Sequence, residues 1–176
     1  RATLHLIDQE YDIMANNADP EVVEKSKKEL GQMEAVLGND ATIDSLVNDI
    51  LDHYENYRAD LLTGKAMVVA YSRAIAMKIY NRILELRPSW KEKVKVVMTE
   101  SNKDPEEWRA VIGNKRRRDE LAKEFKDNNS EMKIAIVVDM WLTGFDVPSL
   151  ATMYVYKPMQ GYNCLLYTSD AADEAR

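Results

Sequence analysis

Four short, continuous apolar runs alternate with helix-length segments in the second part of this chain. The runs lie at residues 66–71, 94–99, 133–138 and 152–156. A continuous apolar run of this length is typical of a strand whose two faces are both buried, as in a parallel sheet. Because helix-length segments separate the runs, we predict an α/β fold in which a parallel sheet is flanked by helices.

A helical extension is predicted ahead of this sheet, over residues 1–63, with the α/β domain at 64–163. The extension is charged and has a break at residues 16–20, and Gly38 with Asn39 is expected to end the helix that follows. The next helix carries an apolar stripe with helical spacing, formed by Ile43, Leu46, Val47, Ile50, Leu51 and Tyr54. We interpret that helix as a packing element without chemistry of its own.

Composition excludes several kinds of function. No apolar run reaches the roughly 18 residues that a membrane-spanning helix needs. A net charge of −6 argues against a polycation that coats nucleic acid, although a local basic patch is still compatible with binding. The single cysteine, Cys164, excludes an internal disulfide and a cysteine metal site, and with two histidines we expect no metal site at all. This usage favours a reducing, cytoplasmic setting.

The loops that follow the first three apolar runs are the candidate sites, because parallel sheets bind ligands at the carboxyl ends of their strands. In the first loop, Ser72 is suited to capping the helix after it. In the second loop, Thr99 and Ser101 offer hydroxyl donors for phosphate oxygens.

The third loop combines two acids with a Thr-Gly pair: Asp139, then Thr143 and Gly144, then Asp146. Glycine lets a backbone approach a phosphate or ribose closely. An aspartate there can accept a hydrogen bond from a ribose hydroxyl or order an arginine. On these residues alone, the loop could also be a plain turn.

Four consecutive basic residues, Lys115–Arg118, begin a predicted helix. Neighbours on a helix point about 100° apart, so at most two of the four can face one duplex. The alternative is a solvated helix face whose cations pair with Asp119 and Glu120.

The third loop and its flanks resemble motif V of superfamily 2 helicases and translocases, whose form is Asp-x-x-x-Arg-Gly-x-Asp-x-Pro. The matching residues are Asp139, Gly144, Asp146 and Pro148. Thr143 stands where the motif has arginine, and Val138 stands where threonine precedes the first acid. Residues 68–73 are similar to motif IV of the same superfamily.

Beyond these motifs, the sequence is similar to that of the motor (R) subunits of type I restriction enzymes. The similarity includes Asp139–Leu150, Met153–Gly161, Trp108 and the basic run after Asn114, and it spans roughly residues 42–163. It implies the second RecA-like lobe of an ATP-driven translocase of double-stranded DNA. The implied cofactors are ATP and Mg²⁺, with Mg²⁺ held mainly by the first lobe. The implied partners, besides DNA, are the specificity and modification subunits of the restriction complex.

The resemblance also implies roles for individual residues. Gly144 and Asp146 would lie at the ATP cleft, and Asp139 belongs to motif V. The implied contacts to the DNA backbone come from Ser72, Arg73, Thr99, Arg117 and Thr143.

Parts of a complete motor are not found in this sequence. It has no Gly-x-x-x-x-Gly-Lys-Ser/Thr phosphate loop, which we expect on the first lobe. The arginine finger is expected shortly after Gly161, and the nuclease elsewhere, so the chain alone should be inactive. Two alternatives stay open: another superfamily 2 helicase acting on DNA or RNA, and a RecA-like module that binds nucleic acid without catalysis.

The last residues, 164–176, follow the segment that carries this similarity. The run Cys164–Glu174 resembles the translation of a transposon-end sequencing adapter. We therefore expect a non-native tail there, with little packing and no stable place in the sheet.

Overall fold

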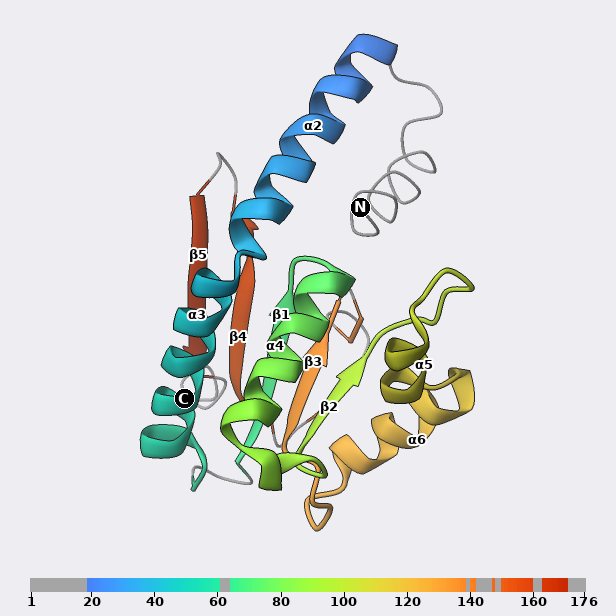
Figure 1. Cartoon of the computed structure of the whole chain (residues 1–176). Helices are drawn as coiled ribbons and strands as arrows, with labels where there is room; N and C mark the ends of the chain where they lie inside the picture. The colour runs from blue at the N-terminus through green and yellow to red at the C-terminus, as the bar shows by residue number, and fades with distance from the viewer. Residues whose placement is uncertain are drawn as a thin grey trace.

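The computed structural model describes residues 19–60, 64–138, 140–141, 147, 150–159 and 163–170, with the backbone alone for 159 and 163–170. Asp139 and residues 142–146 lie outside this described part. Five strands form one sheet in the order β2-β3-β1-β4-β5 (Figure 1). Their bounds are Lys65–Ala70 for β1, Val94–Val97 for β2, Ile134–Val137 for β3, Leu150–Met159 for β4 and Asn163–Asp170 for β5.

The first four strands are parallel, which confirms the predicted fold class. β1 pairs with β3 and β4, and β2 pairs with β3, all in parallel register. All six residues of β1 and all four of β3 are buried, as their continuous apolar runs predict. The observed bounds differ from the predicted ones by a few residues at most, because the ends of an apolar run need not coincide with its last ladder hydrogen bond.

The fifth strand corrects one expectation. Residues 163–170 pair antiparallel with β4, from Asn163 opposite Met159 to Asp170 opposite Thr152. The expectation that residues 164–176 lack a place in the sheet is therefore wrong for the backbone of this segment. An outer strand exposes unpaired N–H and C=O groups that accept any extended segment nearby, and a short connection brings β5 there.

Seven helical segments surround the sheet within the described residues. Their bounds are Pro20–Leu37 for α2, Asp40–His53 for α3, Tyr54–Arg58 for the π-helical η1, Arg73–Leu86 for α4, Pro88–Trp90 for the 3-10 helix η2, Glu106–Ile112 for α5 and Lys115–Lys126 for α6. Four helices begin at a side chain that accepts from a backbone N–H, as N-caps do: Asp19, Asn39, Ser72 and Asn114. The sequence did not predict η1, in which the hydroxyl of Tyr54 donates to the carbonyl of Gly64 just before β1.

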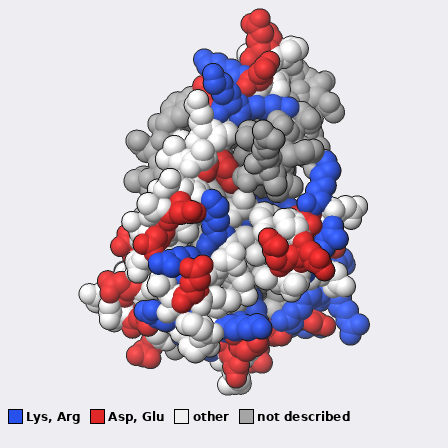
Figure 2. All heavy atoms as spheres, viewed as in Figure 1, with Lys and Arg blue, Asp and Glu red and all other residues white. Residues whose placement is uncertain are grey.

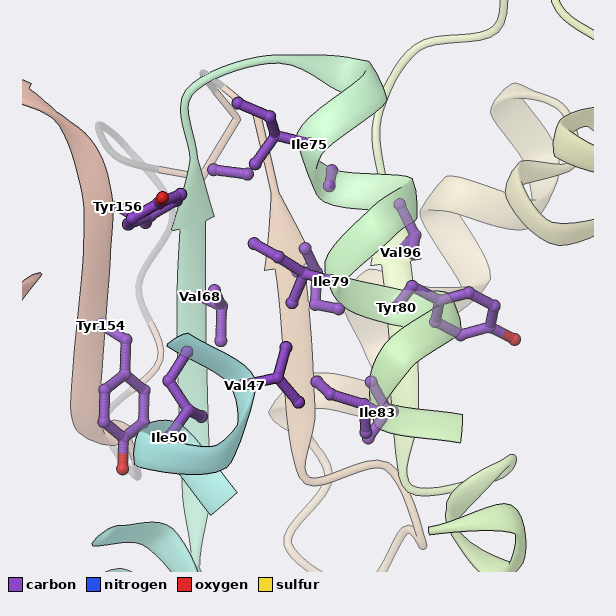
Figure 3. Close-up of a cluster of buried hydrophobic side chains, with 14 of the residues drawn as sticks. Val47, Ile50, Val68, Ile75, Ile79, Tyr80, Ile83, Val96, Tyr154 and Tyr156 are labelled. Carbon is purple, nitrogen blue, oxygen red and sulfur yellow. The ribbon is translucent and has the colours of Figure 1, made fainter. Parts of the chain in front are cut away.

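Helices α3 and α4 cover one face of the sheet. Figure 3 shows Val47 and Ile50 of α3 and Ile79 and Ile83 of α4 on the same face of the sheet. The apolar stripe of α3 is thus a packing surface, as predicted. This packing also places α3 in the same core as the α/β body, although it precedes β1 in the chain.

Helix α6 covers the opposite face. Leu121 and Phe125 are buried against the alternate residues of β1, including Met67 and Val69. The ring of Trp141 stacks on Phe125 with a centroid separation of 5.6 Å and an interplanar angle of 20°. The described chain therefore has three layers, and the strands β1 and β3 are buried on both faces.

A buried lysine ties β1 to the end of α6. The ammonium of Lys65 donates to the carbonyls of Glu124 at 3.2 Å, Asp127 at 2.7 Å and Phe125. These are carbonyls that a helix C-terminus leaves without intrahelical partners. Burial, followed by the nearby charge of Lys133, lowers the pKa of Lys65 to about 8, against an opposing effect of Asp127.

The lowered pKa of Lys65 gives a testable pH dependence of stability. Between pH 8 and the ordinary lysine pKa near 10.5, the unfolded chain binds more protons at this group than the folded chain. The stability of the wild type relative to Lys65→Met should therefore rise as pH increases through this window. Urea unfolding at several pH values measures that difference, with Lys91→Met on an exposed lysine as the control. A difference that shrinks with rising pH would contradict the lowered pKa.

Candidate functional site

The carboxyl edge of the sheet gathers the loops that follow β1, β2 and β3. Tyr71–Arg73 follow β1, and residues 98–105 follow β2. Helix α6 begins at the same edge, since it must return the chain to the start of β3 (Figure 1). The last turn of α2 also lies there, because the Tyr156 hydroxyl on β4 donates to the carbonyl of Leu37 at 3.0 Å.

Ser72 caps α4 as predicted, and it also makes a hydrogen bond to α2 that the sequence did not predict. Its oxygen accepts from the N–H of Ile75 at 3.2 Å, which caps α4 as predicted. Its hydroxyl donates to Oε1 of Glu34 on α2 at 2.6 Å. A direct contact from this hydroxyl to a phosphate would therefore have to replace the bond to Glu34.

Arg73 lies in a buried ion pair with Asp104. Its Nη1 is 2.5 Å from Oδ1 of Asp104 and its Nη2 is 2.6 Å from Oδ2, an arrangement with two parallel bonds. Nη2 also donates to the carbonyl of Thr99 at 2.7 Å, and the guanidinium lies 5.7 Å from the ring centroid of Trp108. Arg73 is 8% exposed and Asp104 is 4% exposed. Both terminal nitrogens of the guanidinium are therefore engaged, while its Nε is buried without a hydrogen-bond partner among the described residues.

Asp104 is a residue whose role the sequence did not reveal. The pattern Asp-Pro-Glu-Glu at residues 104–107 is typical of a helix start with Asp104 as its N-cap, but no side-chain cap hydrogen bond is made at the start of α5. Burial opposes the ionisation of Asp104, yet hydrogen bonds from Arg73 and from the N–H of Ser101 outweigh burial and hold its pKa below the ordinary value. No local pattern could have found this pair, because Arg73 begins α4 and Asp104 lies 31 residues further along the chain.

The loop after β2 is fixed in place while part of it faces solvent. Thr99 is exposed, and its carbonyl is held by Arg73. Glu100 forms an ion pair with Arg118 at the start of α6. A backbone hydrogen bond and the contact with Arg118 lower the pKa of Glu100. The Thr99 side chain therefore sits on an ordered loop at the carboxyl edge, where the sequence predicts a phosphate contact.

The basic run at the start of α6 carries the ion pairs that its alternative interpretation predicts. Lys115 lies 4.0 Å from Asp119, Arg116 lies 3.4 Å from Glu120, and Arg117 shares Glu120 at 3.4 Å and Glu124 at 3.3 Å. The four side chains differ in exposure: 81% for Lys115, 88% for Arg116, 36% for Arg117 and 14% for Arg118. Cations and acids are also mixed over the face shown in Figure 2. Exposed pairs of this kind are weak, so they do not prevent a phosphate from competing.

Four of the predicted site residues lie outside the described part of the chain: Asp139, Thr143, Gly144 and Asp146. The residues on either side of that loop are described. Val138 follows β3, and Trp141 has a φ of 62°, which is uncommon for a bulky side chain.

The described residues contain neither a candidate metal cluster nor a candidate membrane span. In that part of the chain, no group of three or more His, Cys, Asp or Glu side chains could hold a metal ion. Within the same residues, no helix is both long enough and apolar enough to cross a membrane.

Comparison with known proteins decides the family. Residues 89–168 match the family model "Type I restriction enzyme subunit R domain 3". Over 92% of its length the chain is 41% identical to the MjaIXP type I restriction enzyme endonuclease subunit of Methanocaldococcus jannaschii. It is 35% identical, again over 92% of its length, to the type I restriction enzyme HindI endonuclease subunit of Haemophilus influenzae. The chain belongs to the type I restriction R-subunit family.

This R-subunit chain is much shorter than those relatives. It spans 16% of the length of each of the two proteins. The matched family domain runs from η2 through β2, α5, α6, β3 and β4 into β5, so it includes the start of α6 and both loops after β2 and β3.

The buried Arg73–Asp104 pair should contribute strongly to stability. Asp104→Ala leaves the guanidinium buried without its partner, so we expect the free energy of unfolding to fall by about 3 kcal/mol or more. Glu85→Ala removes an exposed acid that pairs with Arg82, and it should cost at most about 0.5 kcal/mol. Urea unfolding of the two variants and the wild type tests the contrast. Equal effects of the two substitutions would show that the Arg73–Asp104 pair is not a buried anchor.

Proposed function

We propose that this chain is part of the ATP-driven DNA-translocating motor of a type I restriction enzyme, where it forms one side of the ATP cleft and contacts the DNA backbone. The observation that carries the proposal is the carboxyl edge of the parallel sheet. There, Ser72, Thr99 and the basic start of α6 meet in a chain of the R-subunit family. Open parallel sheets bind their ligands at this edge.

The residues at this edge suit phosphate more than base edges. Thr99 is an exposed hydroxyl donor, and Arg116 is the most exposed cation of the run. Hydroxyls and cations of this kind hold a nucleic-acid backbone without reading its sequence. That fits a motor that moves along DNA, while recognition of a DNA sequence would belong to a specificity subunit. The proposed partners are accordingly duplex DNA and the specificity and modification subunits, in the cytoplasm.

The ATP side of the proposal rests on the loop after β3. Asp139, Thr143, Gly144 and Asp146 come after β3 in the sequence, and we propose that this segment supplies the nucleotide contact. Asp104 and Glu100 do not suit Mg²⁺, since Asp104 is paired with Arg73 and Glu100 with Arg118. We therefore propose that the metal ligands lie on another lobe of the motor.

Two other functions would give different results in an ATP hydrolysis assay. A superfamily 2 helicase acting on RNA would keep the same edge, but a single-stranded or RNA substrate would stimulate its ATP hydrolysis more than duplex DNA. A binding module without catalysis would bind DNA and show no stimulation in the full-length protein. The R-subunit relatives favour the DNA motor over both.

The loop after β3 gives the first test of this proposal. In the full-length subunit that contains this segment, Asp146→Ala should lower DNA-stimulated ATP turnover, because electrostatic stabilisation at the cleft needs both of its sides. Thermal unfolding of the same variant should be close to wild type. Undiminished ATP hydrolysis in Asp146→Ala would remove the nucleotide-site role from this loop.

The basic start of α6 gives a second test. If Arg117 binds a phosphate, Arg117→Ala should weaken binding to all DNA sequences alike and reduce the dependence of log affinity on log salt by about one. Arg82→Ala is a matched control, because Arg82 also pairs with two acids and is 34% exposed, compared with 36% for Arg117. A salt titration of DNA affinity compares the two. An unchanged slope in Arg117→Ala would leave the basic run as a solvated helix face.

A further inference from the structure

Three arginines from three different helices hold the loop between β2 and α5. Arg73 of α4 binds the carbonyl of Thr99, and Arg109 of α5 donates to the carbonyl of Asn102 at 2.6 Å. Arg118 of α6 pairs with the side chain of Glu100. These three contacts restrict the loop to one conformation, at the edge of the sheet where parallel sheets bind ligands.

Asp104 closes this arrangement from inside the loop. Its Oδ2 accepts from the N–H of Ser101 at 2.8 Å, and its own N–H donates to the carbonyl of Ser101 at 3.0 Å. The same carboxylate takes both bonds from Arg73. One ion pair therefore fixes the turn at residues 101–104 and, through Nη2 of Arg73, the backbone of Thr99.

Arg73 itself cannot serve as a phosphate contact without breaking this pair. Both of its terminal nitrogens are engaged, and its side chain is 9% exposed while that of Asp104 is fully buried. Thr99, in contrast, is exposed and has its backbone, not its side chain, tied down by Arg73. Arg73 therefore holds the backbone of Thr99 in position, and the Thr99 hydroxyl is left exposed to a ligand.

We infer that the Arg73–Asp104 ion pair is a positioning device that holds the Thr99 hydroxyl toward the DNA backbone, so that Arg73 and Asp104 act on DNA affinity only through this loop. The inference rests on the proposed function, because it takes duplex DNA as the ligand of the carboxyl edge. Arg73 then supports the loop and does not bind phosphate itself, and Asp104 becomes a second positioning residue.

The chemistry of a neutral donor explains why such a support is needed. A hydroxyl attracts a phosphate only over hydrogen-bond distance, and the bond weakens steeply as geometry worsens. A cation tolerates displacement better, because its attraction falls off gradually with distance. A neutral contact also displaces no condensed counterion, so losing it changes affinity without changing the salt slope.

The experiment compares Thr99→Val, the neutral pair Arg73→Gln with Asp104→Asn, and all three together, in the full-length subunit containing this segment. DNA affinity is measured over a range of salt concentrations. We expect Thr99→Val and the neutral pair each to weaken binding about three- to tenfold, the range for one hydrogen bond, with an unchanged salt slope. The triple variant should bind no more weakly than either parent, because both changes remove the same contact.

The neutral pair avoids the isolated buried charge that a single substitution would leave, so it should fold. Far-ultraviolet circular dichroism and the DNA affinity of an Arg82→Gln control check this. If the neutral pair does not fold, Asp104→Glu shifts the guanidinium without removing the ion pair, and it should weaken DNA binding at an unchanged slope.

Two results would overturn the inference in different ways. A salt slope reduced by about one in the neutral pair would show that Arg73 binds phosphate directly, and full affinity in that variant would show that the loop needs no such support. In both cases the proposed DNA contact of Thr99 would stand, provided that Thr99→Val weakens binding. Full affinity in Thr99→Val would instead remove the DNA contact from this loop, and the inference would fall with it.

Discussion

A parallel sheet that is buried on both faces can exist only if something apolar covers each face, and this requirement organises the whole chain. β1 lies at the centre with every residue buried. Its even-numbered residues face α3 and α4, and its odd-numbered ones face α6. Even Lys65, at the start of the strand, is drawn inside, where the end of α6 supplies carbonyls for its ammonium. The layer structure follows from the central strand having no side that faces water.

The same requirement creates the candidate site. Helices that cover a parallel sheet must carry the chain back from one edge to the other, so the loops after the strands collect at the carboxyl edge. Loops that meet there can contact each other although they are distant in sequence. The pair between Arg73 and Asp104 is the more buried of two such contacts, and Glu100 with Arg118 is the other. Order at this edge thus comes from contacts between the loop after β2 and the helices around it.

What could be predicted from the sequence depends on whether a feature arises within one element or from contacts between elements that are distant in the sequence. The four parallel strands and the stripe of α3 were predictable, because periodicity and continuous apolar runs reflect burial along a single element. Ser72 as a helix cap was predictable for the same local reason. The role of Asp104 was not, because a carboxylate before proline has the pattern of a cap whether or not a distant arginine claims it. β5 was missed because its place depends on the open edge of β4.

The strand order has a consequence for how the chain is made. β1 does not pair with β2, the next strand in the chain; it pairs with β3, and β2, α5 and α6 are all synthesised between the two. At about 5–20 residues per second, the ribosome releases β1 several seconds before its first neighbour exists. During that time, the described helices that pack on β1 and have already been made are α3 and α4. These two helices can cover one face of β1 before β3 emerges, and the long sequence separation between β1 and β3 predicts slow closure of the sheet.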